Sequence, residues 1–192
     1  MRRVWKKIFR IYKFIKIIFL KNIFGIDYVI NKLLVCEKSN IPKILRFYGA
    51  KIGKKNNFKG GLIVDNANIR DSKKAFYNIE IGDNCYIGKN VFLDLANKII
   101  IEDEVVISAK ATILTHEDVG NRGMQKYYKR VCAPVRIGKG SWIGANGTIL
   151  AGVRIGEYCV VAAGSVVKDD IESFKMVAGI PAKVKKIVGE NE

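Results

Sequence analysis

An aliphatic residue recurs every six positions in the C-terminal half of the chain, and this spacing constrains the fold more than any other feature. The aliphatic positions are Ile137, Ile143, Ile149, Ile155, Val161 and Val167, and the fifth position of each unit is a small residue: Ser141, Gly147, Val153, Cys159 and Ser165. The same phase is present earlier, at Ile81, Ile87, Ile101, Ile107 and Ile113, with a weaker start at Ile52-Gly53. So regular a repeat indicates stacked, nearly identical structural units.

Six residues are enough for one short strand and one tight corner. Three such sides close a coil of about 18 residues, in which the aliphatic side chain points into a narrow prism and leaves room for only a small neighbour. Glycine, which often follows the aliphatic residue, tolerates the corner backbone. The repeat therefore predicts a mainly β protein, a parallel β-helix, and one of the rare left-handed exceptions to right-handed crossovers.

Charge and composition limit the partners of the chain. The 192 residues include 34 Lys and Arg against 18 Asp and Glu, a formal net charge of +16, which implies an anionic partner. A hydrophobic content of 49% excludes a wholly disordered chain. No uncharged apolar run reaches the roughly 18 to 20 residues of a spanning helix. The four cysteines form no CxxC pair, which favours a reducing compartment.

Half of the net charge lies in residues 1–24, which hold eight basic residues and no acid. At about 100° per residue one side of a helix here is apolar and partly aromatic, and the basic residues lie mostly opposite. This stripe consists of Val4, Trp5, Ile8, Ile11, Tyr12, Ile15, Ile18, Phe19 and Ile23. The pattern predicts an amphipathic helix that lies in an anionic membrane interface.

Other interpretations of this segment were weighed against the membrane. Lysines interrupt the apolar stretch that a cleaved signal peptide needs, and a nucleic-acid-binding arm needs no continuous apolar stripe, so we expect no nucleic-acid partner. Packing on the protein's own core or on a neighbouring subunit stays open. We divide the chain into a helical segment, 1–47, whose part from Asp27 to Phe47 continues as helix or turn broken by Pro42, and a β-helix domain with a short C-terminal extension, 48–192.

His116, the only histidine, marks the candidate site. It follows the inward Ile113 by three positions, so we expect it at a corner, and from Asp118 to Ala133 the repeat lapses into a predicted loop. Histidine has the pKa that a base needs to take a proton from an alcohol. Glu117 and Asp118 either orient the imidazole or are solvated loop acids.

Other side chains of the repeat are assigned by position. Asp94 precedes His116 by 22 residues, close to one coil with a small insertion, so the two are expected on neighbouring coils. Cys85 and Cys159 occupy the small inward position of their units and are expected to be inert packing residues.

The stretch from about Ile52 to Ile187 resembles a known family. The run WIGANGTILAGVRIGEYCVVAAGSVVKDDI, followed by VAGIPAKVKKI, is similar to the C-terminal signature of the hexapeptide-repeat acyltransferases of the left-handed β-helix class. Among them the chain is most similar to the maltose, galactoside and polysaccharide O-acetyltransferases. The resemblance implies acetyl-CoA as donor, no metal, direct transfer without an acyl-enzyme, and a homotrimer with sites at its subunit interfaces.

The resemblance also implies roles for individual residues. His116 would be the general base, and Asp94, Asn90 and Glu117 are candidates for acceptor binding. The remaining candidates would bind the donor: Trp142, Ala145 and Ala163 along the pantetheine arm, and Lys168, Lys183 and Lys186 at the nucleotide end.

These observations together predict an acetyl-CoA-dependent O-acetyltransferase that acts on a sugar hydroxyl of a surface polysaccharide or its precursor. Two alternatives stay open: an N-acetyltransferase of an amino sugar or other small acceptor, and a non-catalytic, membrane-associated trimeric scaffold. We expect the protein in the cytoplasm, peripheral on the inner face of a bacterial membrane.

Overall fold

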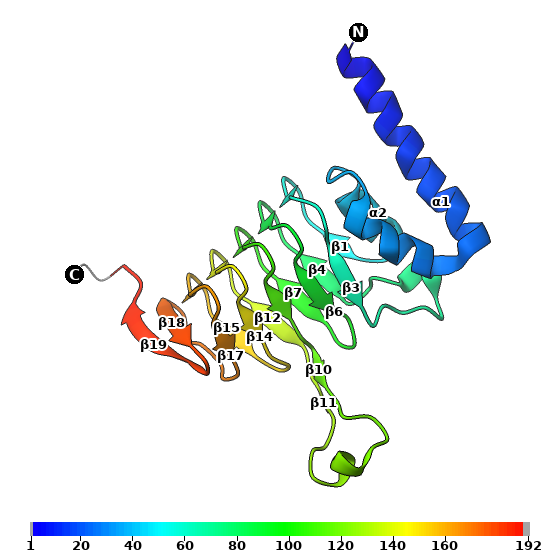
Figure 1. Cartoon of the computed structure of the whole chain (residues 1–192). Helices are drawn as coiled ribbons and strands as arrows, with labels where there is room; N and C mark the ends of the chain where they lie inside the picture. The colour runs from blue at the N-terminus through cyan, green and yellow to red at the C-terminus, as the bar shows by residue number, and fades with distance from the viewer. Residues whose placement is uncertain (1, 190–192) are drawn as a thin grey trace.

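The computed structural model describes residues 2–189, in which two N-terminal helices precede a three-sided stack of parallel strands (Figure 1). Pairs of strands from successive coils lie in register, for example Ile137 with Ile155 and Ile149 with Val167. These partners are 18 residues apart, the coil length that the repeat predicts. The predicted left-handed parallel β-helix is thus confirmed.

Each side of the prism is one sheet. Sheet A consists of β1 (Lys51–Ile52), β4 (Ile79–Ile81), β7 (Ile99–Ile101), β12 (Val135–Ile137) and β15 (Arg154–Ile155). Sheet B consists of β2 (Asn57–Phe58), β5 (Tyr86–Ile87), β8 (Val106–Ile107), β13 (Trp142–Ile143), β16 (Val160–Val161), β18 (Lys175–Gly179) and β19 (Ala182–Ile187). Sheet C consists of β3 (Ile63–Asp65), β6 (Phe92–Asp94), β9 (Thr112–Ile113), β14 (Thr148–Ile149) and β17 (Val166–Val167).

The three corners of the prism differ in regularity. The first corner, from sheet A to B, and the second, from B to C, are tight turns, several with one residue in the left-handed region, such as Asn84, Glu104 and Asn146. The third corner, from sheet C to A, varies in length and carries the short helix η1 (Ser72–Lys74) in one coil and a long excursion in another. Variable loops on a rigid scaffold are where functional groups collect.

The interior of the prism is closely packed. The repeat positions Ile101, Ile107, Ile113 and Ile137 are at most 1% exposed. Cys85 and Cys159 are buried as well, as their inward position predicts, and burial, the largest influence, raises the pKa of both thiols.

Helix α1 (Arg2–Val35) is bent into two arms at Gly25, whose φ of 75° and ψ of −176° are not helical. We call residues 2–24 the first arm and residues 26–35 the second arm. Helix α2 (Ile41–Phe47) follows, and Pro42 lies in its first turn. Proline fits the first turn of a helix because the missing N–H has no partner there, so Pro42 begins a helix where the sequence suggested a break.

The first arm packs on the protein through the side opposite its predicted apolar stripe. Phe14 and Ile17 pack on the core, Arg10 pairs with Glu37, and the Arg10 carbonyl accepts a hydrogen bond from Asn40 Nδ2. Eight of the nine stripe residues are 44–68% exposed: Val4, Trp5, Ile8, Ile11, Tyr12, Ile15, Phe19 and Ile23. The stripe therefore does not pack on the chain's own core. Among residues 2–189, no helix combines the length and apolar character needed to cross a bilayer.

Candidate active site

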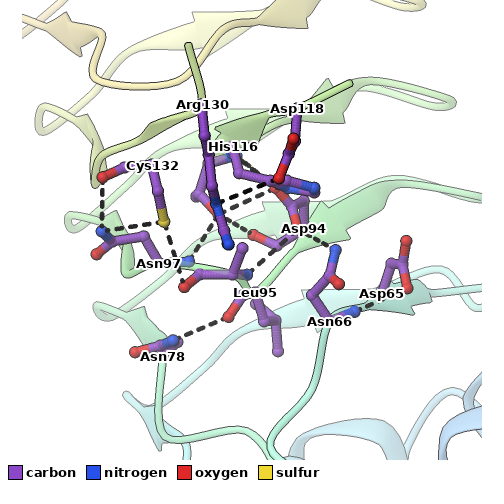
Figure 2. Close-up of polar contacts among 12 residues, drawn as sticks. Asp65, Asn66, Asn78, Asp94, Leu95, Asn97, His116, Asp118, Arg130 and Cys132 are labelled. Carbon is purple, nitrogen blue, oxygen red and sulfur yellow. Dashed lines mark hydrogen bonds and ion pairs between the residues drawn. The ribbon is translucent and has the colours of Figure 1, made fainter. Parts of the chain in front are cut away.

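The third corner brings His116 against Asp94 of the preceding coil. Asp94 is the last residue of β6, and His116 follows β9, which pairs with β6. His116 Nδ1 lies 2.6 Å from Asp94 Oδ2 (Figure 2). The two residues thus form a carboxylate–imidazole pair built by the stacking of adjacent coils.

Asp94 is 1% exposed and has its carboxylate oxygens occupied by protein donors. Oδ2 accepts hydrogen bonds from the backbone N–H groups of Thr115 (2.8 Å) and His116 (2.9 Å), and Oδ1 accepts one from Asn66 Nδ2 (2.8 Å). Burial raises the pKa of Asp94, but the hydrogen bonds from His116, Thr115, Asn66 and Ala96 outweigh it and hold the pKa at about 2. Asp94 is therefore ionised at neutral pH.

The ionised carboxylate determines which imidazole nitrogen carries the proton. Because Asp94 can only accept, Nδ1 of a neutral His116 must be the donor, and Nε2 is left with its lone pair free. The His116 side chain is 29% exposed, so the ring reaches solvent at the corner. This arrangement can take a proton from a hydroxyl group at Nε2 and stabilise the resulting imidazolium.

The loop predicted after His116 is an arm that projects from the prism (Figure 1). Its base is a two-stranded antiparallel ladder of β10 (His116–Glu117) and β11 (Val131–Cys132), and its tip carries the short helix η2 (Gly123–Lys126). Asp118 accepts a hydrogen bond from the Gly120 N–H and lies 3.6 Å from Arg130. The Glu117 side chain is exposed. The imidazole is oriented by Asp94, and neither Glu117 nor Asp118 has a contact with it.

Several predicted site residues lie on other parts of the prism. Asn90 is a left-handed residue of the second corner, with φ 59°, and its N–H donates to the Gly60 carbonyl. Ala145 and Ala163 lie at the same corner, two successive coils apart in the stack. Trp142 is on sheet B, half exposed, and its Nε1 donates to Ser108 Oγ. In one chain, none of these residues is at the corner of His116.

The predicted lysines gather at the C-terminal end of the molecule. Lys168 follows β17 at the third corner, the same corner as His116. Lys183, on β19, lies 3.6 Å from Asp169, the residue after Lys168. Lys186 is also on β19, which forms an antiparallel hairpin with β18. This edge of the prism is therefore basic beyond His116.

Asn66 is a site residue that the sequence analysis missed. It follows β3, whose Asp65 pairs with Asp94 in the parallel ladder, so it lies one coil before Asp94. Its left-handed backbone, φ 53°, directs Nδ2 to Asp94 Oδ1. The available signal was the weak first coil, whose spacing to the next is 29 residues and hides the register. Within residues 2–189 no three metal-ligating side chains come together.

Comparison with known proteins agrees with the repeat. The family model described as hexapeptide repeat of succinyl-transferase matches residues 78–114 and 134–168. Galactoside O-acetyltransferase of Escherichia coli is 30% identical over 115 residues, 60% of this chain and 57% of that protein. Serine acetyltransferase 4 of Arabidopsis thaliana is 35% identical over 116 residues, 60% of this chain and 32% of that protein. The chain thus spans between about a third and three fifths of these relatives.

A solved structure covers more of the fold. The hexapeptide-repeat acetyltransferase of Vibrio cholerae has a TM-score of 0.71 at 26% identity, over 91% of this chain and 94% of that one. The same Vibrio protein is also known as a complex with acetyl coenzyme A, there with a TM-score of 0.66 over 82% of this chain and 81% of that one. With its repeat, its fold and these similarities, the chain belongs to the hexapeptide-repeat family of left-handed β-helix acyltransferases.

Proposed function

We propose that this protein is an acetyl-CoA-dependent O-acetyltransferase whose acceptor is a sugar hydroxyl of a surface polysaccharide or its precursor. The observation that carries the proposal is the pair of His116 and buried Asp94, which leaves Nε2 free at an exposed corner. A transfer from a thioester to an alcohol needs one such base. The galactoside O-acetyltransferase among the relatives supports the choice of a sugar hydroxyl.

The proposed reaction needs no covalent intermediate on the protein. His116 Nε2 takes the proton of the acceptor hydroxyl while its oxygen attacks the thioester carbonyl. The C–S bond then breaks, and the imidazolium returns the proton to the departing thiolate. The products are an acetyl ester and the free thiol of coenzyme A, and Asp94 holds the ring in place throughout.

The second corner offers groups for the donor. Within the described part of the chain, the backbone N–H groups of Ala145 and Ala163 have no hydrogen-bond acceptor. Such donors fit the amide carbonyls of a pantetheine arm, and the N–H near Ala145 suits a developing oxyanion. Lys168 and Lys183 fit the phosphates of the nucleotide end, since ammonium groups bind phosphate by charge-assisted hydrogen bonds.

The separation of these groups favours a homotrimer. His116 and the lysines are at the third corner, whereas Ala145 and Ala163 are at the second, across one face of the prism. Base and donor can meet if the third corner of one copy faces the second corner of the next. A closed ring of three copies would form three such grooves, each completed by two chains.

The first arm of α1 supports a place at the membrane. Its apolar stripe is exposed, includes Trp5, Tyr12 and Phe19, and is flanked by lysines, which is the composition of a helix in an anionic interface. We therefore propose that the protein binds the inner face of a bacterial membrane peripherally, near lipid-linked glycan precursors.

The serine acetyltransferase among the relatives makes a small amino-acid hydroxyl the second candidate acceptor. A small soluble acceptor gives the exposed stripe of α1 no role. Assays with serine and with sugar acceptors in parallel distinguish the two candidates.

The donor part of the proposal is tested by calorimetric titration of acetyl-CoA into the purified protein. We expect saturable binding of one molecule per chain, weakened about tenfold or more in Lys168→Ala/Lys183→Ala. The control is Lys126→Ala/Lys129→Ala, which removes the same charge from the projecting arm and should bind normally. Absence of binding by the folded wild type would contradict the proposal.

The membrane part is tested by flotation with anionic vesicles. Ile8→Ser/Ile15→Ser removes two exposed stripe residues and should lower vesicle binding about tenfold or more, because each buried aliphatic side chain contributes about 1 kcal/mol or more. Ile69→Ser/Val184→Ser changes two equally exposed residues away from α1 and should have no effect. Equal binding by both variants would contradict this interface.

A further inference from the structure

A cleft of about 260 Å³ lies between the two arms of α1 and the segment that leads to α2. Lys13 and Lys16 of the first arm and Lys32 of the second arm line it, together with Tyr28 and the buried Asn40. Figure 1 shows α1 extending beyond the N-terminal end of the β-helix, so the cleft is remote from the arm that carries His116. The proposed acetyl transfer gives it no role.

The cleft is strongly cationic. Its one acidic lining residue, Glu37, is already paired with Arg10. Among residues 2–189 no carboxylate is within ion-pair distance of Lys13, Lys16 or Lys32. Three ammonium groups that converge without a counter-ion favour an anionic ligand, and phosphate is the group that they bind best.

Asn40 contributes an acceptor to the same cleft. It is 1% exposed, and its Nδ2 is used by the Arg10 carbonyl, but its Oδ1 is buried without a hydrogen-bond donor. A buried acceptor without a partner destabilises the protein, and a ligand hydroxyl that donates to Oδ1 would remove that cost. The ligand that satisfies both features carries a phosphate and a free hydroxyl.

The position of the cleft connects it to the exposed stripe. At about 100° per residue, Ile17 faces the second arm, whereas Lys16 lies beside the stripe residues Tyr12 and Ile23. A helix that buries this stripe in the acyl region would hold Lys16 at the level of the lipid headgroups.

We infer that the cleft binds the glycerophosphate headgroup of an anionic membrane lipid. The inference rests on the proposed peripheral membrane binding and adds a headgroup specificity to it. The volume of about 260 Å³ is below the roughly 300 to 1,000 Å³ of pockets for drug-sized ligands, which suits a single headgroup. Phosphatidylglycerol has the required chemistry, since its phosphodiester is charged and its terminal glycerol carries hydroxyls. Phosphatidylserine has the same net charge but lacks these hydroxyls.

The test measures binding of the full chain to two kinds of phosphatidylcholine vesicle, one with phosphatidylglycerol and one with phosphatidylserine at equal surface charge. We expect the wild type to bind the phosphatidylglycerol vesicles about fivefold more tightly, the ratio that one additional hydrogen bond gives. Lys16→Gln/Lys32→Gln should bring this ratio close to one. The matched control, Lys6→Gln/Lys7→Gln, removes the same charge from the first arm outside the cleft and should weaken both bindings by the same factor.

The outcomes separate the headgroup site from membrane binding itself. Equal binding of the wild type to both vesicles, or an equal change of the ratio in both variants, would overturn the headgroup site and leave membrane binding intact. No binding to either vesicle would overturn both. Free glycerol phosphate, added at the concentration of accessible lipid, should leave the ratio unchanged; loss of the ratio would assign the cleft to a soluble phosphate ester.

Discussion

Asp94 is the residue on which the site depends, because it holds two neighbouring coils and one imidazole at the same time. Its carboxylate accepts hydrogen bonds from Asn66 on one side and from Thr115 and His116 on the other. The donors keep the charge buried and the pKa low. We therefore interpret Asp94 as a positioning residue that acts through His116, a different role from the acceptor binding that the family resemblance implied.

Asp94→Asn should lower kcat about 10²- to 10⁴-fold, because an amide at this position can donate to Nδ1 and favour the wrong tautomer of His116. The KM for acetyl-CoA should change little, since Asp94 is not at the corner of Ala145 and Ala163. Steady-state kinetics measure the two effects separately. A large rise in KM with normal kcat would assign Asp94 to donor binding.

The same carboxylate should make stability depend on acid. Its pKa is about 2 in the folded protein and about 3.9 in an unfolded chain, so its contribution is complete above pH 4 and is lost as the pH falls through 2. The contribution is on the order of 2 kcal/mol. Urea unfolding of wild type and Asp94→Asn should show a difference in stability that shrinks between pH 4 and pH 2. A difference independent of pH would contradict a depressed pKa.

Sequence reasoning placed His116 at a corner and Asp94 one coil away, and the structure brings the two into contact. That success depends on the repeat, which turns sequence distance into height along the prism. Asn66 could not be found in this way because 13 residues, from Asn66 to Asn78, separate sheet C from sheet A in its coil. The unpartnered oxygen of Asn40 is a property of packing and leaves no sequence signal.

At the scale of the elements, glycine after the inward aliphatic residue sets the spacing between coils. A Cβ on Gly144 would lie 2.5 Å from the backbone nitrogen of Ala163, whereas one on Gly123, in the projecting arm, would meet nothing within 4 Å. The repeat therefore needs glycine at Gly144 because of stacking.

Gly144→Ala should destabilise the protein by about 1 to 3 kcal/mol, the usual cost of overpacking, and lower its thermal midpoint. Gly123→Ala is the matched control and should leave the midpoint close to that of the wild type. Calorimetry of both variants measures the effect. Equal midpoints for the two would mean that adjacent coils separate easily at this corner.

The elements that the repeat governs were predictable, and those outside it were less so. Five consecutive units from Ile137 define coils that the structure reproduces in register. The bend of α1 at Gly25 was missed, because the amphipathic pattern of the first arm ends only one residue earlier and the chain then looks like a weaker helix. The projecting arm was predicted as a loop, but its antiparallel base pairs residues too short and polar to signal strands.

At the scale of the whole molecule, a single chain leaves two kinds of surface uncovered. The apolar stripe of α1 is one, and the faces of the prism, with the half-exposed Trp142 on sheet B, are the other. The account assigns the first to lipid and the second to neighbouring copies, with the net charge of +16 directing the protein to an anionic surface.

Sedimentation equilibrium should accordingly give three times the chain mass of 21.5 kDa, and Ile8→Ser/Ile15→Ser should remain trimeric while it loses vesicle binding. Assembly through the prism does not need the stripe. Dissociation of this variant into monomers would instead assign the stripe to contacts between copies.

The most direct test of the central claim is nitrogen NMR of the imidazole. Because His116 is the only histidine, protein labelled with ¹⁵N-histidine and freed of any histidine tag reports one ring. The account predicts that neutral His116 carries its proton on Nδ1, bonded to Asp94, and keeps Nε2 unprotonated for the acceptor hydroxyl. A neutral ring protonated mainly at Nε2 would contradict it, because that nitrogen could not then act as the base.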